Sequence, residues 1–186
     1  MRARRDYARP VRRASPAGRE VVRPTAARVR DALFNSLGAD TAGARVLDLF
    51  AGTGTLGIEA LYRDAIHAVF VEHDARHAKA IEDRLRGEGL RGRAEVRMED
   101  AVVAVGRLAA RGARFDVVLL DPPYGAGWLA RTIAAVAEAG LLAPGAVIVA
   151  EGHWRDKPAL PGGLMVAREA RYGETVLWFI RAKSRA

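Results

Sequence analysis

Short hydrophobic runs alternate with amphipathic stretches through most of the chain. The runs have the length and composition of β-strands and fall at residues 45–50, 68–72, 94–98, 115–120 and 146–150. The stretches between them are predicted to be helices and fall at residues 55–63, 74–87, 100–111 and 127–140. Strands that alternate with helices at this spacing indicate βαβ units, and therefore a parallel sheet covered by helices on both faces.

The beginning of the chain follows another pattern. Residues 1–22 hold prolines and a glycine among many arginines and show little periodicity, so we expect a basic N-terminal arm there. Pro24 and Thr25 are typical of a helix start, and the apolar positions that follow repeat about every 3.6 residues. Gly38 is typical of a helix end, so we predict a helix between Thr25 and Gly38.

The end of the chain is predicted to be a β-hairpin. Residues 164–170 and 174–180 alternate in the manner of strands around Arg171-Tyr172-Gly173, and we expect this hairpin at one edge of the sheet. The predicted fold class is therefore α/β, with a mainly parallel seven-stranded sheet that ends in an antiparallel hairpin. We expect one domain over residues 23–186, preceded by the arm.

Composition narrows the class of protein. The chain has 186 residues, half of them hydrophobic, which is enough for one sizeable core, and it has no cysteine for a disulfide or a thiolate metal site. His73 and His77 stand four residues apart, but with no third ligand nearby we expect a solvated helix face and no metal. No apolar run reaches the ~20 residues of a membrane span. We expect a soluble cytoplasmic monomer.

The charge is concentrated at the N-terminus. The first thirty residues hold ten arginines against two acidic residues and so carry the whole net charge of +8, while the rest of the chain is neutral. Such an arm on a neutral domain suits the binding of a polyanion, although a disordered solubilising tail has the same composition. Guanidinium groups bind phosphate in a bidentate manner, which favours nucleic acid as the partner.

A glycine-rich turn after the first strand is the first chemical motif. Residues 46–57 read Val-Leu-Asp-Leu-Phe-Ala-Gly-Thr-Gly-Thr-Leu-Gly, a buried strand that runs through a turn into a helix. Gly52 and Gly54 allow the backbone to approach a ligand closely, and the helix N-terminus offers free N–H donors. The turn is typical of nucleotide-like ligands, and Asp48 followed by Phe50 and Ala51 distinguishes it from dinucleotide-binding turns.

Acidic residues close the next two strands. Glu72, followed by His73, lies about twenty residues beyond the glycine turn, where a carboxylate accepts hydrogen bonds from the hydroxyls of a ribose. Asp74 is expected to cap the following helix. Asp100 and Ala101 follow the third strand, where Asp100 is positioned to accept from the amino group of an adenine, to cap its helix, or to do both.

The most specific motif is Asp121-Pro122-Pro123-Tyr124 at the end of the fourth strand. The nitrogen lone pair of an exocyclic amine is delocalised into its ring, so methylation requires acceptors that localise the lone pair. A carboxylate and a carbonyl at the Asp-Pro junction serve as these acceptors, and two successive prolines hold them rigidly. The aromatic ring of Tyr124 is suited to stack on a base that has left its helix.

These motifs together resemble the RsmD family of small-subunit ribosomal RNA guanine-N2 methyltransferases. The resemblance spans residues 21–180 and depends on the block Arg-Pro-Thr-x-x-Arg-Val-Arg-x-x-Leu-Phe-Asn, which begins at Arg23. It implies a class I, Rossmann-like fold and S-adenosylmethionine (SAM) as methyl donor. The implied substrate is 16S ribosomal RNA (rRNA) in the 30S subunit or an assembly intermediate, methylated on N2 of guanine 966 in the rRNA numbering.

The resemblance also assigns residues to roles. Around SAM it places Asp48, Phe50, Ala51, Gly52, Gly54, Glu72, His73, Asp100, Ala101 and Asp121. At the target base it places Asp121, Pro122, Pro123 and Tyr124. Near the RNA we expect Arg12, Arg13, Arg23, Thr25, Arg28 and Arg30, with Asn35 near the RNA or the cofactor lid.

Other functions remain open from the sequence. The Asp-Pro-Pro-Tyr chemistry also serves adenine N6 and cytosine N4 in RNA or DNA, although the chain is short for a DNA enzyme with its own target-recognition domain. A non-catalytic RNA-binding module of ribosome assembly that retains the fold is an alternative from another class. An NAD-dependent oxidoreductase is disfavoured because the turn lacks the G-x-G-x-x-G spacing.

Overall fold

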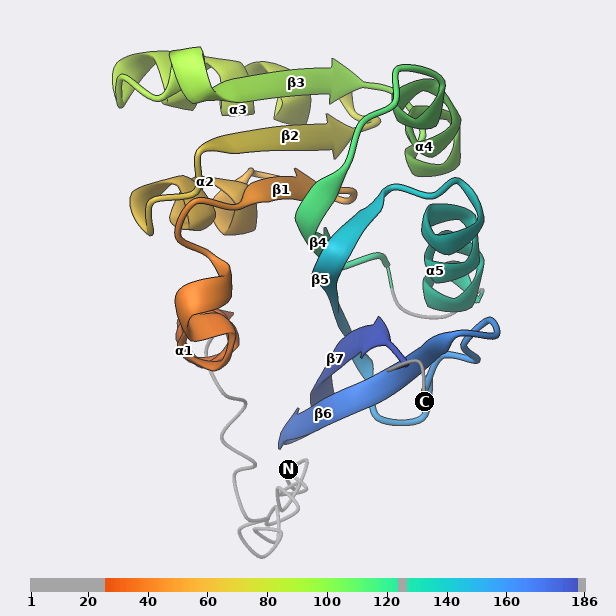
Figure 1. The fold of residues 1–186 in the computed structure, drawn as a ribbon. Helices are drawn as coiled ribbons and strands as arrows, with labels where there is room; N and C mark the ends of the chain where they lie inside the picture. Colours follow the sequence, from red (N-terminus) through yellow and green to blue (C-terminus); the bar gives the residue numbers. More distant parts are fainter. Residues whose placement is uncertain (1–25, 124–126, 184–186) are drawn as a thin grey trace, which may run out of the picture.

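The computed structural model describes residues 26–123 and 127–183, and its centre is a seven-stranded sheet of order β3-β2-β1-β4-β5-β7-β6 (Figure 1). The strands are β1 (Arg45–Asp48), β2 (His67–Glu72), β3 (Ala94–Met98), β4 (Phe115–Leu120), β5 (Leu142–His153), β6 (Leu164–Tyr172) and β7 (Thr175–Ala182). The α-helices are α1 (Ala26–Leu37), α2 (Thr55–Tyr62), α3 (Ala75–Gly87), α4 (Ala101–Ala110) and α5 (Trp128–Glu138). Strands β1 to β5 pair in parallel, and β7 is antiparallel to both β5 and β6. The predicted fold class is confirmed.

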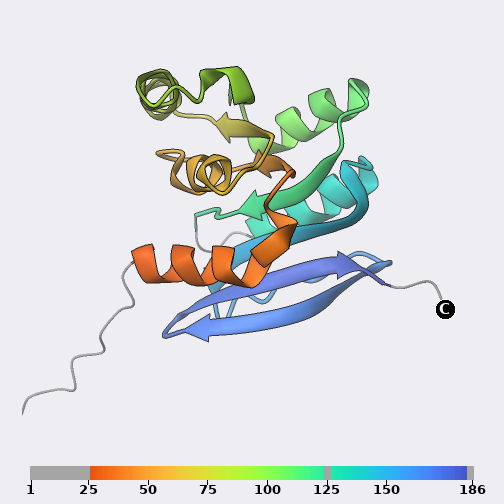
Figure 2. The ribbon, with the colours of Figure 1, turned by 60° about the vertical axis from the view of Figure 1, so that its left-hand side comes forward.

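Helices cover both faces of the sheet. Successive strand residues point to opposite faces, so Val46 packs in one apolar cluster with α1, α2 and α3, and Leu47 packs in a second with α4 and α5. Figures 1 and 2 show these helices on the two sides of the sheet. The inner strands are therefore buried on both faces, which explains why they read as continuous hydrophobic runs in the sequence.

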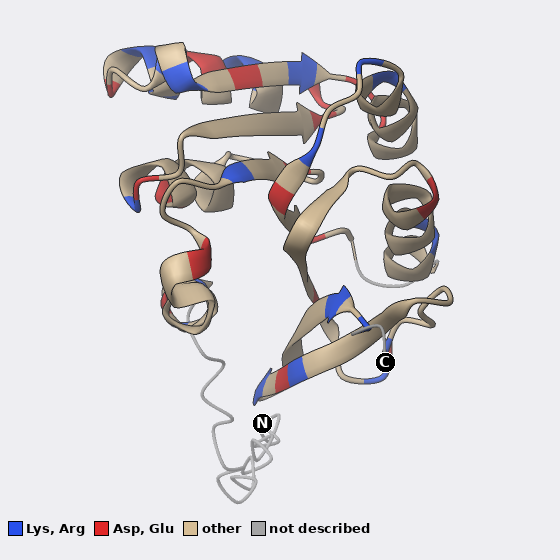
Figure 3. Ribbon diagram, in the orientation of Figure 1, with Lys and Arg blue, Asp and Glu red and all other residues tan. Residues whose placement is uncertain are grey.

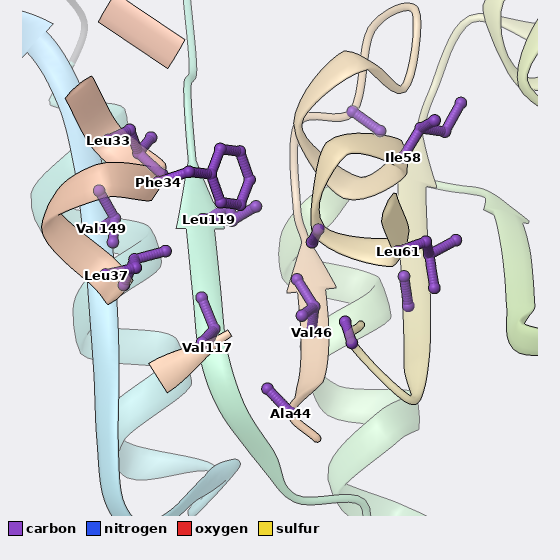
Figure 4. Close-up of a cluster of buried hydrophobic side chains, with 14 of the residues drawn as sticks. Leu33, Phe34, Leu37, Ala44, Val46, Ile58, Leu61, Val117, Leu119 and Val149 are labelled. Atoms are coloured by element: carbon purple, nitrogen blue, oxygen red, sulfur yellow. The ribbon is translucent and has the colours of Figure 1, made fainter. Parts of the chain in front are cut away.

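Helix α1 is fixed to the sheet by its apolar face. Leu33, Phe34 and Leu37 are buried, and Figure 4 shows them lying over Leu119 of β4 and Val149 of β5. Phe34 is only 1% exposed, so truncating it to alanine is expected to cost about 3–5 kcal/mol of stability. This packing holds the start of α1 beside the ends of the central strands.

Charged residues are fewer on the inner strands than on the edge strands. Figure 3 shows charges along the edge strands β3 and β6 and on the helices, and charged positions on β1 and β4 as well. In contrast, β2 has one acidic residue, Glu72, and β5 has one, Glu151, each near the carboxyl end of its strand. A carboxylate at the end of a buried strand is costly to desolvate, so these two positions mark a site.

Strands β1 and β5 are among those whose bounds differ from the prediction. Strand β1 stops at Asp48, because residues 49–50 already belong to the turn. Strand β5 is longer than the predicted 146–150. It begins before Pro144 and Gly145, where its pairing with β4 shifts register opposite Phe115 and Val117. Its pairing with β7 extends it to His153. The pattern could not show this, because proline and glycine usually end a strand and the partner is distant in sequence.

The carboxyl ends of the parallel strands meet at one edge of the sheet. The chain winds from β1 outward to β2 and β3 and then returns to β4 on the other side of β1. Such a reversal leaves a crevice between β1 and β4, where α/β folds bind their ligands. Across the described part of the chain, no helix is long and apolar enough to cross a membrane, and no three His, Asp or Glu side chains cluster as metal ligands.

Candidate active site

A cavity of about 640 Å³ lies at this edge of the sheet. Its walls come from residues at or just after the ends of β1, β2, β3 and β4 and from the first turns of α3, α4 and α5. They consist of Leu49, Phe50, Gly52, Val71, Glu72, His73, His77, Glu99, Asp100, Ala101, Asp121, Pro122, Pro123 and Trp128. The volume suits a nucleoside-sized ligand. Seven of the ten residues predicted for the cofactor line this cavity: Phe50, Gly52, Glu72, His73, Asp100, Ala101 and Asp121.

The glycine turn that follows β1 forms part of the cavity wall. Gly52 and Gly54 have φ angles of 54° and 76°, a left-handed conformation that favours glycine. The Ala51 N–H donates to the Val71 carbonyl at 3.0 Å, which ties the turn to β2. Gly54 lines neither this cavity nor the adjoining cavity that Asp48 borders. It is the N-cap residue of α2 and packs against Ile81.

Glu72 is held in place before any ligand arrives. Its Oε2 accepts from the Gly52 N–H at 2.8 Å, and its Oε1 accepts from the Asp74 N–H at 2.8 Å. The side chain is 6% exposed, so the carboxylate has one face in the cavity and one orientation. Each carboxylate oxygen has a second lone pair for a ligand hydroxyl, although His73 Nδ1 lies 3.1 Å from Oε1, so Oε2 is the freer acceptor.

Asp48 is buried at the end of β1 with one oxygen unused. Its Oδ2 accepts from the Gly57 N–H at 3.0 Å, whereas its Oδ1 has no partner among the described residues. Burial, opposed by this hydrogen bond, raises the pKa of Asp48 from 3.8 to about 7. A cation beside Oδ1 would restore the charged form, so the geometry suits an ammonium group.

A second cavity of about 360 Å³ adjoins the first and shares Phe50, Gly52 and Asp121 with it. Arg30 of α1 and Asp48 border this second cavity. Within the described structure, Arg30 Nε and Asp48 Oδ1 are two of four buried side-chain polar atoms without a hydrogen-bond partner. Arg30 Nε lies 4.0 Å from a carboxylate oxygen of Asp31 and of Glu59, which is too far for a hydrogen bond. Buried atoms of opposite charge that lack a hydrogen bond on one cavity suit a zwitterionic ligand, such as an α-amino acid.

Acidic caps begin the two helices beside the cavity. Asp74 accepts from the Arg76 and His77 N–H groups, and Asp100 accepts from those of Val102 and Val103, so both predicted N-caps are confirmed. Both bonds to Asp100 use Oδ1, which leaves Oδ2 for a ligand donor at the cavity wall.

The Asp-Pro-Pro turn separates the cavities. Asp121 borders the first and second cavities, and Pro122 and Pro123 border the first and a third of about 210 Å³. Solvent reaches Asp121 from the open cleft, but the surrounding walls desolvate it enough to raise its pKa from 3.8 to about 6. Tyr124, the last residue of the motif, lies outside the described residues.

Trp128 was not predicted as a site residue. It lies at the start of α5, lines both the first and third cavities, and meets the Phe50 ring edge-on at a centroid distance of 6.2 Å. The Arg131 guanidinium lies 4.9 Å from its ring. A tryptophan directly after a glycine, four residues beyond the Asp-Pro-Pro-Tyr motif, was the available signal.

Glu151 and a cationic cluster beyond it were also missed. Glu151 follows Ala150, which pairs with Leu120, so it lies beside Asp121 at the carboxyl ends of β5 and β4. Three residues further, Trp154 is exposed and the Arg155 and Arg171 guanidiniums lie 4.7 and 4.8 Å from its ring. We call Trp154, Arg155 and Arg171 the Trp154 cluster.

The predicted RNA residues fall into two groups. Arg28 is exposed on α1, and Arg30 is half-buried against the second cavity. Asn35 is exposed further along the same helix. The other predictions lie outside the described residues: Arg12, Arg13, Arg23 and Thr25. Residues 1–22, predicted to form the arm, also lie outside them.

The strand order and the crevice between β1 and β4 define the class I, Rossmann-like methyltransferase fold. A solved structure of ribosomal protein L11 methylase from Lactobacillus delbrueckii subsp. bulgaricus matches with a TM-score of 0.69 over 85% of this chain and 79% of that one. At 15% identity, this likeness shows the fold alone.

Within that class, the chain belongs to the RsmD family: the family described as conserved hypothetical protein 95 matches residues 11–181. Ribosomal RNA small subunit methyltransferase D of Escherichia coli (strain K12) is 35% identical over 158 residues, which are 82% of this chain and 76% of that protein. The solved structure of yhhF from Escherichia coli matches with a TM-score of 0.79 and 32% identity over 88% of this chain and 89% of that one. The family predicted from the sequence is confirmed.

Proposed function

We propose that this protein transfers a methyl group from SAM to the exocyclic N2 of a guanine in 16S rRNA, at position 966 of the small subunit. Its relatives in Escherichia coli and Haemophilus influenzae bear the name ribosomal RNA small subunit methyltransferase D. The observation that carries the proposal is the position of Asp121. It stands where the nucleoside-sized cavity meets the cavity bordered by Arg30 and Asp48, beside two prolines that fix the turn.

The residues around both cavities fit SAM. Glu72 would hold the ribose hydroxyls and Asp100 the adenine amino group, since both carboxylates keep free acceptor positions toward the first cavity. In the second cavity, Asp48 would hold the α-ammonium group and Arg30 the α-carboxylate, which satisfies the two orphaned atoms. When bound, SAM supplies an electrophilic methyl group on a sulfonium.

Asp121 prepares the amine for attack. Its carboxylate and a carbonyl at the Asp-Pro junction accept hydrogen bonds from the two N–H groups, which localises the nitrogen lone pair toward the methyl group. Charge disperses during the transfer, so orientation contributes more than basicity, and well-oriented reactants gain on the order of 7–11 kcal/mol. After transfer, Asp121 passes the extra proton to water.

The Trp154 cluster would bind the RNA beside the target base. Each guanidinium lies over the ring, and neither pairs with a described acidic side chain. Arg171 Nε donates to the Gly173 carbonyl at 2.8 Å, and the other N–H groups of the two guanidiniums remain available to phosphate. The cluster follows β5 directly, and β5 ends at the same edge of the sheet as Asp121. With the arginine-rich arm, it gives the RNA a second cationic contact.

Methylation of 30S particles that lack the modification tests the proposal. Purified protein with radiolabelled SAM is expected to transfer one methyl group per particle, and mass mapping of the 16S rRNA should locate it on guanine N2. The Asp121→Ala variant should lose turnover while calorimetry shows affinity for S-adenosylhomocysteine (SAH) within a few-fold of the wild type. Label on adenine or cytosine, or near-normal turnover by the variant, would contradict the proposal.

A further inference from the structure

Glu151 is a second carboxylate beside the Asp-Pro-Pro turn. The in-register pair Leu120 and Ala150 places Asp121 and Glu151 next to each other on parallel strands, which run about 4.8 Å apart. Both residues border the second cavity, and Glu151 also borders the third cavity with Pro122 and Pro123. A group that contacts Asp121 from the open side of the turn therefore also comes within reach of Glu151.

Nothing in the described fold uses this carboxylate. Glu151 is half-buried, yet within residues 26–123 and 127–183 no side chain or backbone N–H donates to it and no cation lies within 4 Å of it. Its backbone pairs with Leu177 of β7, which fixes its position. Burial and the neighbouring charge of Asp121 raise its pKa from 4.5 to about 7. An unpaired carboxylate in a cleft is costly unless a ligand supplies the donor.

The chemistry of the three candidate amines differs at the neighbouring ring nitrogen. In guanine the N2 amine lies beside N1–H, which is a donor. In adenine the N6 amine lies beside N1, and in cytosine the N4 amine lies beside N3, and both of these ring nitrogens are acceptors. One carboxylate at the amine therefore serves all three bases, whereas a second carboxylate beside it favours guanine and repels the other two.

We propose that Glu151 determines the base specificity by accepting a hydrogen bond from N1–H of the target guanine while Asp121 holds the N2 amine. This inference rests on the proposed function and deepens it. The N1–H donor would also stabilise the ionised form of Glu151, because a hydrogen bond to a charged acceptor favours the charge. Glu151 is thus a residue that touches the substrate and reads the base, while Asp121 orients the reacting nitrogen.

The test compares guanine with 2-aminopurine, which keeps the 2-amine but has an acceptor at N1. 30S particles are assembled from ligated 16S rRNA that carries either base at the target position. For the wild type, kcat/KM should be at least about tenfold higher with guanine, the typical effect of losing a hydrogen bond to a charged group. In Glu151→Gln the amide can turn and donate to N1, so the ratio should fall to about threefold or less.

Two further variants support the comparison. Glu151→Ala should lower kcat/KM for guanine more than Glu151→Gln, because Gln can still accept from N1–H. Glu174→Gln removes an exposed carboxylate from the β6–β7 turn and should keep the wild-type ratio. All variants should bind SAH within a few-fold of the wild type by calorimetry, which also reports that they are folded.

Distinct outcomes overturn the inference. An unchanged guanine to 2-aminopurine ratio in Glu151→Gln shows that Glu151 does not read N1. A large loss of SAH affinity with an unchanged ratio assigns Glu151 to the cofactor instead. If the wild type itself methylates no guanine in the particles, the proposed function fails and the inference falls with it; the first two outcomes leave the proposed function intact.

Discussion

Replacing Asp48 with asparagine should stabilise the ligand-free protein at alkaline pH and weaken its binding of the cofactor. Asparagine keeps an oxygen that accepts from the Gly57 N–H and removes only the buried charge. Asp48 has a pKa of about 7 in the fold against an ordinary 3.8, so between pH 5 and pH 8 the folded state must release a proton that the unfolded state has already lost. Stability from this group is therefore present at low pH and is lost as the pH rises through 7.

The size of the effect follows from the pKa difference. Between pH 5 and pH 8 the wild type should lose about 2–3 kcal/mol of unfolding free energy through Asp48, at 1.36 kcal/mol per pKa unit. For a chain of 186 residues this corresponds to a Tm change of about 5–10 °C. Asp48→Asn should lack that loss, so its Tm relative to the wild type should rise by this amount between the two pH values.

Thermal melts of the ligand-free proteins at pH 5 and pH 8 measure this difference. Glu138→Gln, which removes an exposed carboxylate at the end of α5, serves as the matched control and should follow the wild type. Calorimetry should show that Asp48→Asn binds SAH at least about tenfold more weakly, because it loses the charge opposite the α-ammonium group. An equal loss of Tm between pH 5 and pH 8 in Asp48→Asn and the wild type would refute the reasoning.

Three other predictions concern the cofactor, the pH and the RNA. Arg30→Gln should weaken SAH binding about tenfold but leave 5′-methylthioadenosine, which lacks the amino-acid group, within about twofold by calorimetry; equal losses would exclude a carboxylate contact. Asp121 and Glu151 accept hydrogen bonds most strongly when ionised, and their pKa values are about 6 and 7, so kcat/KM should fall as the pH drops from 8 to 5.5; a flat profile would contradict this. Deleting residues 1–20 should weaken binding to any RNA and flatten its salt dependence in filter-binding assays, whereas an unchanged slope would show that the arm does not contact phosphate.

Most of the fold could be predicted from local patterns in the sequence. The parallel strands and helices follow from runs and periods in the sequence, and their predicted ends lie close to the observed ones. Strand β5 is the exception, because its last three residues are held by β7, a partner about 25 residues further along the chain. The hydrophobicity of a segment does not predict an extension that depends on pairing with a distant strand.

The site residues also divide into those that the local sequence predicts and those that depend on distant parts of the chain. Asp48 and Glu72 end buried strands and Asp121 directly follows one, so their positions at one edge follow from the topology. Arg30 was predicted to contact RNA, yet its side chain borders the second cavity, where we propose that it holds the cofactor. Glu151 was missed because the predicted strand stopped at residue 150. Reading the next residue in register with Asp121 would have found it.

The extension of β5 by β7 also bears on how the protein is synthesised. The strands and turns that surround the first cavity are complete once β4 and the start of α5 have left the ribosome. Glu151 and the Trp154 cluster cannot be fixed until β7 has emerged and paired with β5. The carboxylate that we propose to select the base therefore depends on a strand from near the end of the sequence, whereas the walls of the first cavity come from segments that precede β5.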